Sequence, residues 1–448
     1  MNDVDIQAAQ ATTTTPLPGA MPVSANECGD DETAVDLTLF KVIGLQRLLD
    51  PGSKGRRLRA MYKWIACLTL TIQLMQVVGL YTSVNDVQRF ASLAVLAFNE
   101  ITCSFKGILL VTNADRMRAV LDVAMYRYTT CGYRQPANMR LTSATVSTLL
   151  RTFTMIAYFM LVTWIVIPLF TGVDYVQIEH SDGTAGAYRK TIDNIWLPGM
   201  SETVYNWPPV WATIYATEVV MLTVDAVIWV MFDCYLITVC FVLNAQFRTL
   251  AAGYETIGRQ RLNLRRGVDS LKSMGGKSDD GDIDSLDYYE ELIVHIKDNQ
   301  NIIKKYDEFL EIVRPLVITQ VVSSSISIVG LVFLIELLYV MGEPITFGPV
   351  LRLIFGLIYV IIQFYIYCYS LNYIEIAKCK LNFGLYSSNW TEMDLKFKKT
   401  LFLAMSMNSA HMKVMKLSPK YIINLEMFAA VMKMSYSVVS VIVNSIEK

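Results

Sequence analysis

Long apolar blocks alternate along the chain with polar, charged segments. A helix needs roughly 20 mostly apolar residues to cross a bilayer, and seven blocks have about this length or more. They lie at residues 64–82, 91–111, 149–170, 210–247, 315–340, 350–371 and 421–443. We therefore predict an all-α membrane protein with seven transmembrane helices.

The polar segments between these blocks also contain helical patterns. The fourth block has 38 residues, and its helix would be about 57 Å long, well beyond the ~30 Å hydrocarbon core. Apolar residues recur at helical spacing over 288–315, directly before the fifth block, and over 387–417, ending before Ser418 and Pro419. These segments predict a helical anchor layer next to the membrane.

The distribution of Lys and Arg predicts the orientation of the chain. The segments before the first, third, fifth and seventh blocks contain seven, five, eleven and eight of these residues. The other four segments, including the one after the seventh block, contain one, two, none and one. Basic residues are enriched on the cytosolic side. We therefore expect a cytosolic N-terminus, an extracellular C-terminus and a cytosolic anchor layer.

Four regions follow from these patterns. Residues 1–35 are polar and predict a disordered tail. Residues 36–386 contain the first six transmembrane helices with their cytosolic extensions, 387–418 the cytosolic anchor helix, and 419–448 the seventh helix.

The composition contains little that suggests catalysis. The chain is 53% hydrophobic and 18% charged, with three His and eight Cys. We find no catalytic constellation, no phosphate-binding loop and no Cys/His spacing typical of a metal site, so we expect no enzyme activity and no cofactor. We also expect no nucleic-acid partner. The cysteines lie in apolar blocks or predicted cytosolic segments, which indicates free thiols.

Three acidic residues stand inside the fourth block: Glu218, Asp225 and Asp233. Charged side chains inside a membrane usually face the bundle interior or water. They therefore indicate either an ion pathway or structural pairing with a basic residue, for which Lys106, Arg151 and Lys433 are the candidates.

Several motifs resemble the insect odorant receptor family. The C-terminal segment contains Phe428 followed by Lys433 and Ser435-Tyr436-Ser437, which is similar to the ending of these receptors. Upstream motifs that fit the family are Gly384-Leu385-Tyr386, Trp390, Phe397-Lys398-Lys399, Leu197-Pro198 and Trp207-Pro208. The 433–437 stretch departs from the co-receptor ending, which is typical of a ligand-tuned subunit.

The resemblance implies a function and a set of partners. Members of the family are ligand-gated, non-selective cation channels in which four subunits surround one pore lined by the last helix of each. It implies a heterotetramer with odorant co-receptor subunits in the plasma membrane of a sensory neuron dendrite. A small volatile organic molecule would bind in the outer half of the bundle, and cations would permeate the pore.

The candidate ligand-binding residues are aromatic, aliphatic or hydroxyl side chains in the outer half of four blocks, which suit a small apolar ligand. The same residues also suit ordinary helix packing. They are Phe98, Met155, Tyr158, Phe159, Val162, Thr213, Ile214, Thr217, Ile354, Leu357 and Ile358.

Two arguments about the pore disagree. Helical spacing places Lys433, Ser437, Ser440 and Asn444 on one face, and this polar face alone predicts a water-filled lining. Matching Ser435-Tyr436 to the co-receptor ending instead implies a hydrophobic gate at Val439, with Ile442 and Val443 beside it. Such a ring closes a pore by dewetting. In the anchor helix, Leu401 and Met405 are the candidate subunit contacts.

Other classes fit less well. A gustatory receptor channel of the same superfamily shares these features. A G-protein-coupled receptor has the opposite orientation, and no Asn-Pro pair is present in the chain. We see no duplicated halves of the kind that indicate a secondary transporter.

The orientation can be tested at the single glycosylation sequon, Asn389-Trp390-Thr391. It lies on the predicted cytosolic side, where glycosyltransferases do not act. We expect no glycan on Asn389 in cells, measured by glycosidase-dependent gel mobility. A sequon engineered after residue 446 serves as the positive control, and a glycan on Asn389 would contradict the orientation.

Overall fold

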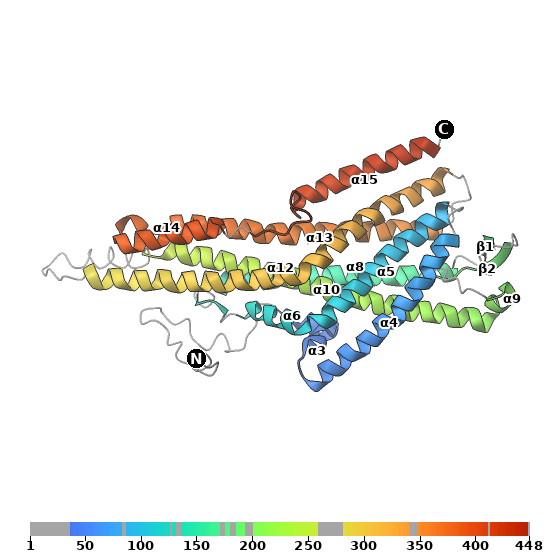
Figure 1. Ribbon diagram of the computed structural model, residues 1–448, viewed down its shortest axis with the longest axis horizontal. Coiled ribbons are helices and arrows are strands. Elements are labelled where there is room, and N and C mark those ends of the chain that lie inside the picture. Colours follow the sequence, from blue (N-terminus) through green and yellow to red (C-terminus); the bar gives the residue numbers. More distant parts are fainter. Residues whose placement is uncertain are drawn as a thin grey trace. The chain divides into compact units, whose positions relative to one another are not determined.

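Figure 1 shows the computed structural model of the chain. The structure describes residues 36–82, 87–125, 128–130, 136–170, 175–179, 185–192, 200–258, 281–340, 347–410 and 413–446. The predicted disordered tail, residues 1–35, lies outside the described residues.

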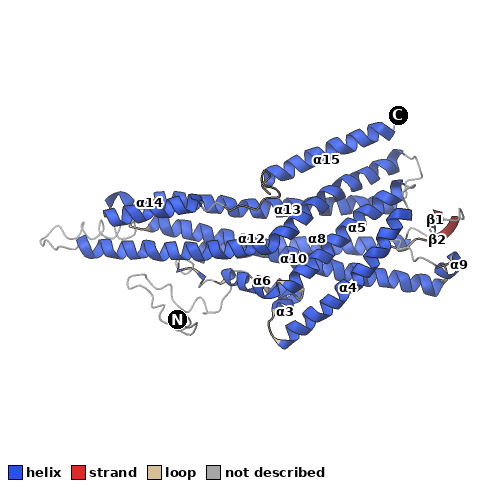
Figure 2. Cartoon of the chain, in the orientation of Figure 1, coloured by secondary structure: helices blue, strands red, loops and turns tan. Residues whose placement is uncertain are grey.

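Helices make up almost all of the described residues, as Figure 2 shows. The first group comprises α2 (Thr38–Val42), α3 (Leu45–Leu49), α4 (Ser53–Thr82), α5 (Val87–Thr112), α6 (Ala114–Leu121), η1 (Asp122–Ala124) and α8 (Pro136–Phe170). After the strands β1 (Tyr175–Glu179) and β2 (Ala185–Arg189) come α9 (Glu202–Tyr205), α10 (Pro208–Thr256), α12 (Gly281–Val340), α13 (Phe347–Tyr386), η3 (Trp390–Glu392), α14 (Leu395–Ala410) and α15 (Leu425–Ile446).

The seven predicted spans correspond to α4, α5, α8, α10, α12, α13 and α15, so the all-α membrane fold is confirmed. Within the described part of the chain, five of these have both the length and the hydropathy of a membrane span: α5, α8, α10, α12 and α13. Some side chains of α4 and α15 lie outside the described set.

Helix α10 forms the centre of the bundle. It packs against α5, α8, α12 and α13, and all its side chains from Val230 to Phe247 are buried. Its 49 residues correspond to about 74 Å, which confirms that the fourth span continues well beyond a membrane. The amphipathic segment before the fifth span also joins it in one helix, the 60-residue α12, which contains Pro315.

The extensions of α10, α12 and α13 lie side by side with α14 on one side of the bundle (Figure 1). This is the predicted helical layer. Its last helix is shorter than the predicted 387–417, because Asp394 caps the start of α14 by accepting a hydrogen bond from the Phe397 backbone N–H at 2.8 Å. The chain after α14 instead forms a turn closed by a bridge between Lys416 and Ile422.

Two glycines lie where neighbouring helices pack closely. A Cβ at Gly384 in α13 would lie 2.4 Å from the Ala251 carbonyl oxygen in α10. A Cβ at Gly330 in α12 would lie 2.4 Å from Val95 in α5. Small residues let helix backbones approach in this way, so these two positions set the spacing of the bundle.

Candidate functional site

A fully buried ion pair joins α5 to α10. The Lys106 ammonium lies 2.7 Å from the Asp233 carboxylate, and both side chains have no exposed surface. The ammonium also lies 3.9 Å from the centre of the Trp229 ring, a favourable position over an aromatic face. Of the three partners proposed for the acidic residues, Asp233 therefore has Lys106.

Polar side chains from two further helices complete this site. Gln363 and Tyr367, both in α13, donate hydrogen bonds to Asp233, the former at 2.5 Å. Gln320 in α12 donates to Gln363 at 3.2 Å. A buried carboxylate is tolerated only when its oxygens are paired, and here both oxygens have partners. The network links α5, α10, α12 and α13 at one level of the bundle.

The second acidic residue, Glu218, belongs to a different site at the β-hairpin end of the bundle. It accepts hydrogen bonds from the Thr191 hydroxyl and the Ile192 backbone N–H, each at 2.8 Å. Arg352 in α13 donates to the Ile192 carbonyl at 3.0 Å and stacks 3.9 Å over the Trp164 ring of α8. These contacts tie the segment after β2 to three helices. Glu218 thus has a structural role.

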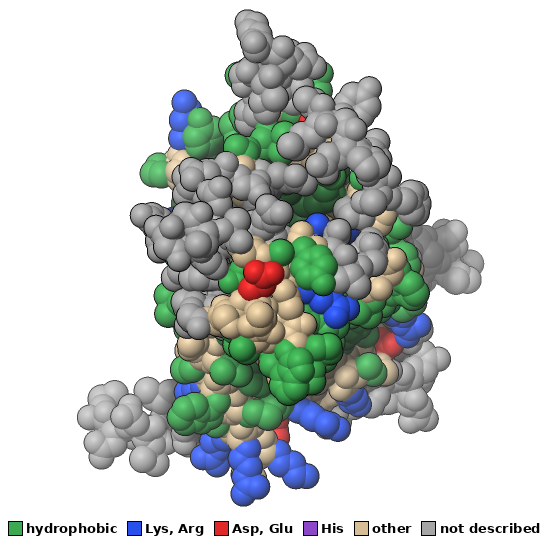
Figure 3. Space-filling model, turned by 90° about the vertical axis from the view of Figure 1, so that its right-hand side faces the viewer, with side chains coloured by type: hydrophobic (Ala, Val, Ile, Leu, Met, Phe, Trp, Pro, Cys, Tyr) green, Lys and Arg blue, Asp and Glu red, His purple; other side chains and the backbone are tan. Residues whose placement is uncertain are grey.

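The hairpin itself was not predicted from the sequence. Strands β1 and β2 pair antiparallel, with Tyr175 opposite Arg189. Tyr188 and Tyr205 pack edge to face at 5.3 Å, and the Arg189 guanidinium lies 3.7 Å over the Trp211 ring. Figure 3 looks onto this end of the bundle, where hydrophobic side chains dominate the described surface.

The predicted ligand-binding residues differ in how far they are buried. Most of them are exposed on the single chain, Met155 at 71% of its surface. Only three are half-buried: Tyr158, Ile214 and Leu357. The exposed ones are Phe98, Met155, Phe159, Val162, Thr213, Thr217, Ile354 and Ile358.

Aromatic side chains that the sequence analysis missed fill the boundary between α8 and α13. Phe153 stacks on Tyr359 at 6.0 Å, and Phe355 contacts Phe159 edge to face at 5.3 Å. Gly356 faces Trp164, to which an added Cβ would come within 3.3 Å. Phe355 and Tyr359 are one helical turn apart, and this spacing is the sequence pattern that could have predicted the contact between α8 and α13.

Helix α15 contacts only one side of the bundle in the described structure, through α12 and α13. Phe428 packs against Phe364 at 5.3 Å and Tyr365 at 5.5 Å. Val439 is 6% exposed and lies on the same buried face as Ser435. The predicted valine gate therefore turns toward its own chain here.

The opposite face of α15 carries the predicted polar stripe. Lys433, Ser437 and Ser440 are exposed, together with Tyr436 and Val441. The side chains of Ile442, Val443 and Asn444 lie outside the described residues. The choice between the two pore faces stays a prediction.

The two predicted subunit contacts on α14 lie inward. Leu401 is 5% exposed, and Met405 is partly buried against the core of its own chain. The large apolar side chains exposed on this helix are Leu395, Phe402, Leu403 and Met407.

A charged cluster lies where α12 and α13 meet the chain between α14 and α15. Lys378 donates to the Lys413 carbonyl at 2.9 Å and lies 4.4 Å from the Tyr306 ring centre. Lys413 pairs with Asp307 at 2.9 Å. One turn beyond the predicted sixth span, burial raises the pKa of Glu375 to about 7, an effect that nearby Lys378 opposes.

Comparisons with known proteins give one family match and a similar fold. The family model described as 7tm odorant receptor matches residues 86–436. The fold is similar to that of the insect olfactory receptor OR5 from Machilis hrabei, with a TM-score of 0.66 and 13% identity over 90% of this chain and 97% of that one.

The structure of that receptor in complex with eugenol gives a TM-score of 0.67 and 12% identity, over 91% of this chain and 98% of that one. A search of curated protein sequences finds no significant match.

Removing one member of the buried ion pair tests the central network. We expect Lys106→Met to lower the free energy of unfolding by about 3–5 kcal/mol, because Asp233 is left charged and buried without its partner. Adding Asp233→Asn should restore part of the loss. Thermal unfolding of the purified protein in detergent measures both variants.

The control is Lys380→Met, which removes an exposed lysine from α13. A melting temperature for Lys106→Met equal to that of the control would contradict a stabilising role for the pair.

Proposed function

Since this chain belongs to the 7tm odorant receptor family, we propose that it is a ligand-tuned subunit of an odorant-gated, non-selective cation channel. The family match over residues 86–436 carries this proposal. The chain would assemble with odorant co-receptor subunits into a heterotetramer in the plasma membrane of a sensory dendrite. Its N-terminus would be cytosolic, as the distribution of Lys and Arg suggests.

The ligand would be a small, largely apolar volatile molecule. The complex of the Machilis hrabei receptor with eugenol supports this class of ligand. We place the site between α8, α10 and α13 in the half of the bundle that faces the β-hairpin. Tyr158, Ile214 and Leu357 are the predicted residues of these helices that are half-buried, and the ring of Phe355 lies on the boundary between α8 and α13.

Subunits would meet through exposed apolar side chains of α14. Phe402, Leu403 and Met407 are exposed, whereas Leu401 and Met405 face the core of their own chain. An exposed apolar patch of this kind is typical of an interaction surface. Replacing Leu401 would therefore affect folding before it affects assembly.

Substitutions at two residues of α8, Tyr158 and Met155, test which side of this helix contacts the ligand. With co-receptor present, we expect Tyr158→Ala to raise the odorant concentration for half-maximal current at least tenfold, because it removes an aromatic wall of the site. Met155→Ala, the matched control, should change it less than twofold, because Met155 is exposed. Whole-cell currents over an odorant panel provide the measurement. No odorant-evoked current from the native chain with co-receptor would reject the proposed function, and equal effects of the two substitutions would reject this site.

Cysteine substitution distinguishes the two pore faces. If the exposed stripe of α15 lines the pore, external thiol reagents should block Ser437→Cys and Ser440→Cys in the open channel and spare Val439→Cys. If α15 rotates into the valine-gate arrangement, Val439→Cys should be blocked instead. Current before and after the reagent is the readout, and the unsubstituted channel is the control. If the reagent blocks the current of all three variants equally, both arrangements are contradicted.

A further inference from the structure

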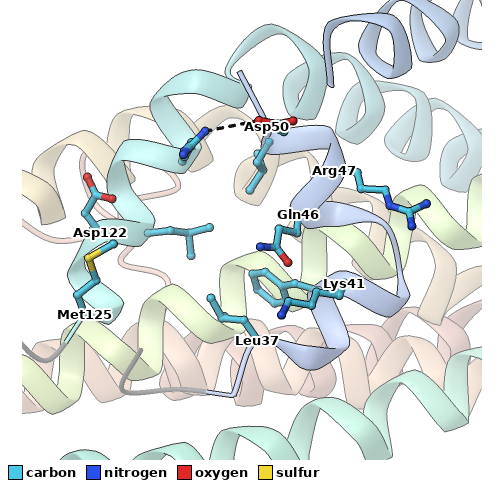
Figure 4. A pocket seen from close by; sticks show the side chains of 11 residues that line it. Leu37, Lys41, Gln46, Arg47, Asp50, Asp122 and Met125 are labelled. Carbon is cyan, nitrogen blue, oxygen red and sulfur yellow. Dashed lines mark ion pairs between the residues drawn. The ribbon is translucent and has the colours of Figure 1, made fainter. Parts of the chain in front are cut away.

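A cavity of about 610 Å³ opens between two short helical segments, α2–α3 and α6–η1 (Figure 4). One part of its wall is apolar and includes Phe40, Leu49 and Leu121. The other part carries the basic side chains of Lys41, Arg47 and Arg118 beside the carboxylates of Asp50 and Asp122. Figure 4 shows Leu37 and Gln46 directed into the space between the two segments. The cavity is thus apolar on one side and charged on the other, where basic side chains outnumber acidic ones by one.

The basic side chains at its rim have few internal partners. Arg118 reaches Asp50 only at 3.9 Å. Within the described part of the chain, neither Lys41 nor Arg47 makes an ion pair. Arg59 differs, since it pairs with Asp115 at 2.8 Å. The rim carries three basic side chains, Lys41, Arg47 and Arg118, and two acidic ones, Asp50 and Asp122. Lys41 and Arg47 are therefore the basic groups that no ion pair of the described residues occupies.

The start of α4 adds to this charge. The turn from α3 to α4 is tight, because a Cβ at Gly55 would lie 2.0 Å from the Asp50 carbonyl oxygen. Lys54, Arg56 and Arg57 follow directly and are exposed. Figure 3 shows Lys and Arg gathered at the lower edge of the molecule, where α4 begins in Figure 1.

Along the chain, the walls of this cavity lie next to the ends of two predicted spans. Its α2–α3 wall precedes the first predicted span, whose first residue Trp64 is 78% exposed. Its other wall includes α6, which begins three residues after the second predicted span ends at residue 111. Exposed Trp at the end of a span is typical of the headgroup region. The basic side of the bundle is the cytosolic side in the proposed orientation, and that leaflet contains the anionic lipids.

We propose that this cavity binds the headgroup of an anionic phospholipid of the cytosolic leaflet. Lys41 and Arg47 contact the phosphate, and the first turn of α4 strengthens the attraction. The apolar wall of Phe40, Leu49 and Leu121 accommodates the acyl end of the lipid. This assignment rests on the proposed orientation of the chain and is independent of which odorant the channel detects.

Lipid titration of the intact complex tests the site. The full chain, purified with the subunits it assembles with, is placed in phosphatidylcholine nanodiscs with increasing phosphatidylinositol bisphosphate. A ligand that binds the folded state raises the melting temperature. We expect K41Q/R47Q to weaken the apparent affinity at least tenfold, since each basic residue near the surface contributes to the attraction. K380Q/K399Q removes two exposed lysines of the anchor layer and should leave the affinity unchanged.

Two further arms separate this site from the alternatives. Q46W fills the cavity without changing its charge, so it should weaken the apparent affinity as well. Full affinity in Q46W would show that only a basic surface is involved, and equal losses in the two double variants would show non-specific attraction. Soluble inositol trisphosphate should stabilise the complex less than the lipid does. Equal stabilisation would indicate a soluble phosphate. Each of these three results overturns the proposal.

Discussion

A charge inside a bilayer must be neutralised by the protein, because lipid tails provide no hydrogen-bond partner. Lys106 and Asp233 meet this requirement by pairing at 2.7 Å with no exposed surface. Gln363 and Tyr367 of α13 donate further hydrogen bonds to the Asp233 carboxylate. Lys106 comes from α5 and the other two partners from α13, so these contacts align α5, α10 and α13 with one another. The apolar packing around the pair depends on this alignment.

The same alignment also positions the parts of these helices that lie outside the membrane-spanning segments. Helices α10, α12 and α13 each continue without interruption into the layer that contains α14. On α13, Gln363 faces the buried network while its neighbours Phe364 and Tyr365 contact Phe428 of α15. One turn of α13 thus touches both the central ion pair and the last helix. A rotation of α13 at this turn changes both contacts together.

The spans and their continuation were predictable because length and periodicity depend on backbone geometry alone. The direction in which each side chain points was much less predictable. Lipid and protein interior are both apolar, so Met155 and Phe159 satisfy the same pattern as the buried Phe153. Contacts with residues far apart in the sequence, such as the pairing of Phe153 with Tyr359, determine the inner face of α8. Val439 illustrates the same limit, because its burial depends on the angle at which α15 meets α12 and α13.

At the β-hairpin end, one residue of backbone holds two helices at once. The N–H of Ile192 is bound by Glu218 of α10, and its carbonyl is bound by Arg352 of α13. Any increase in the separation of these helix ends must stretch both bonds or release one of them. The segment after β2 therefore acts as a strap of fixed length. It limits how far α10 and α13 can separate at this end of the bundle before Glu218 or Arg352 loses its hydrogen bond to Ile192.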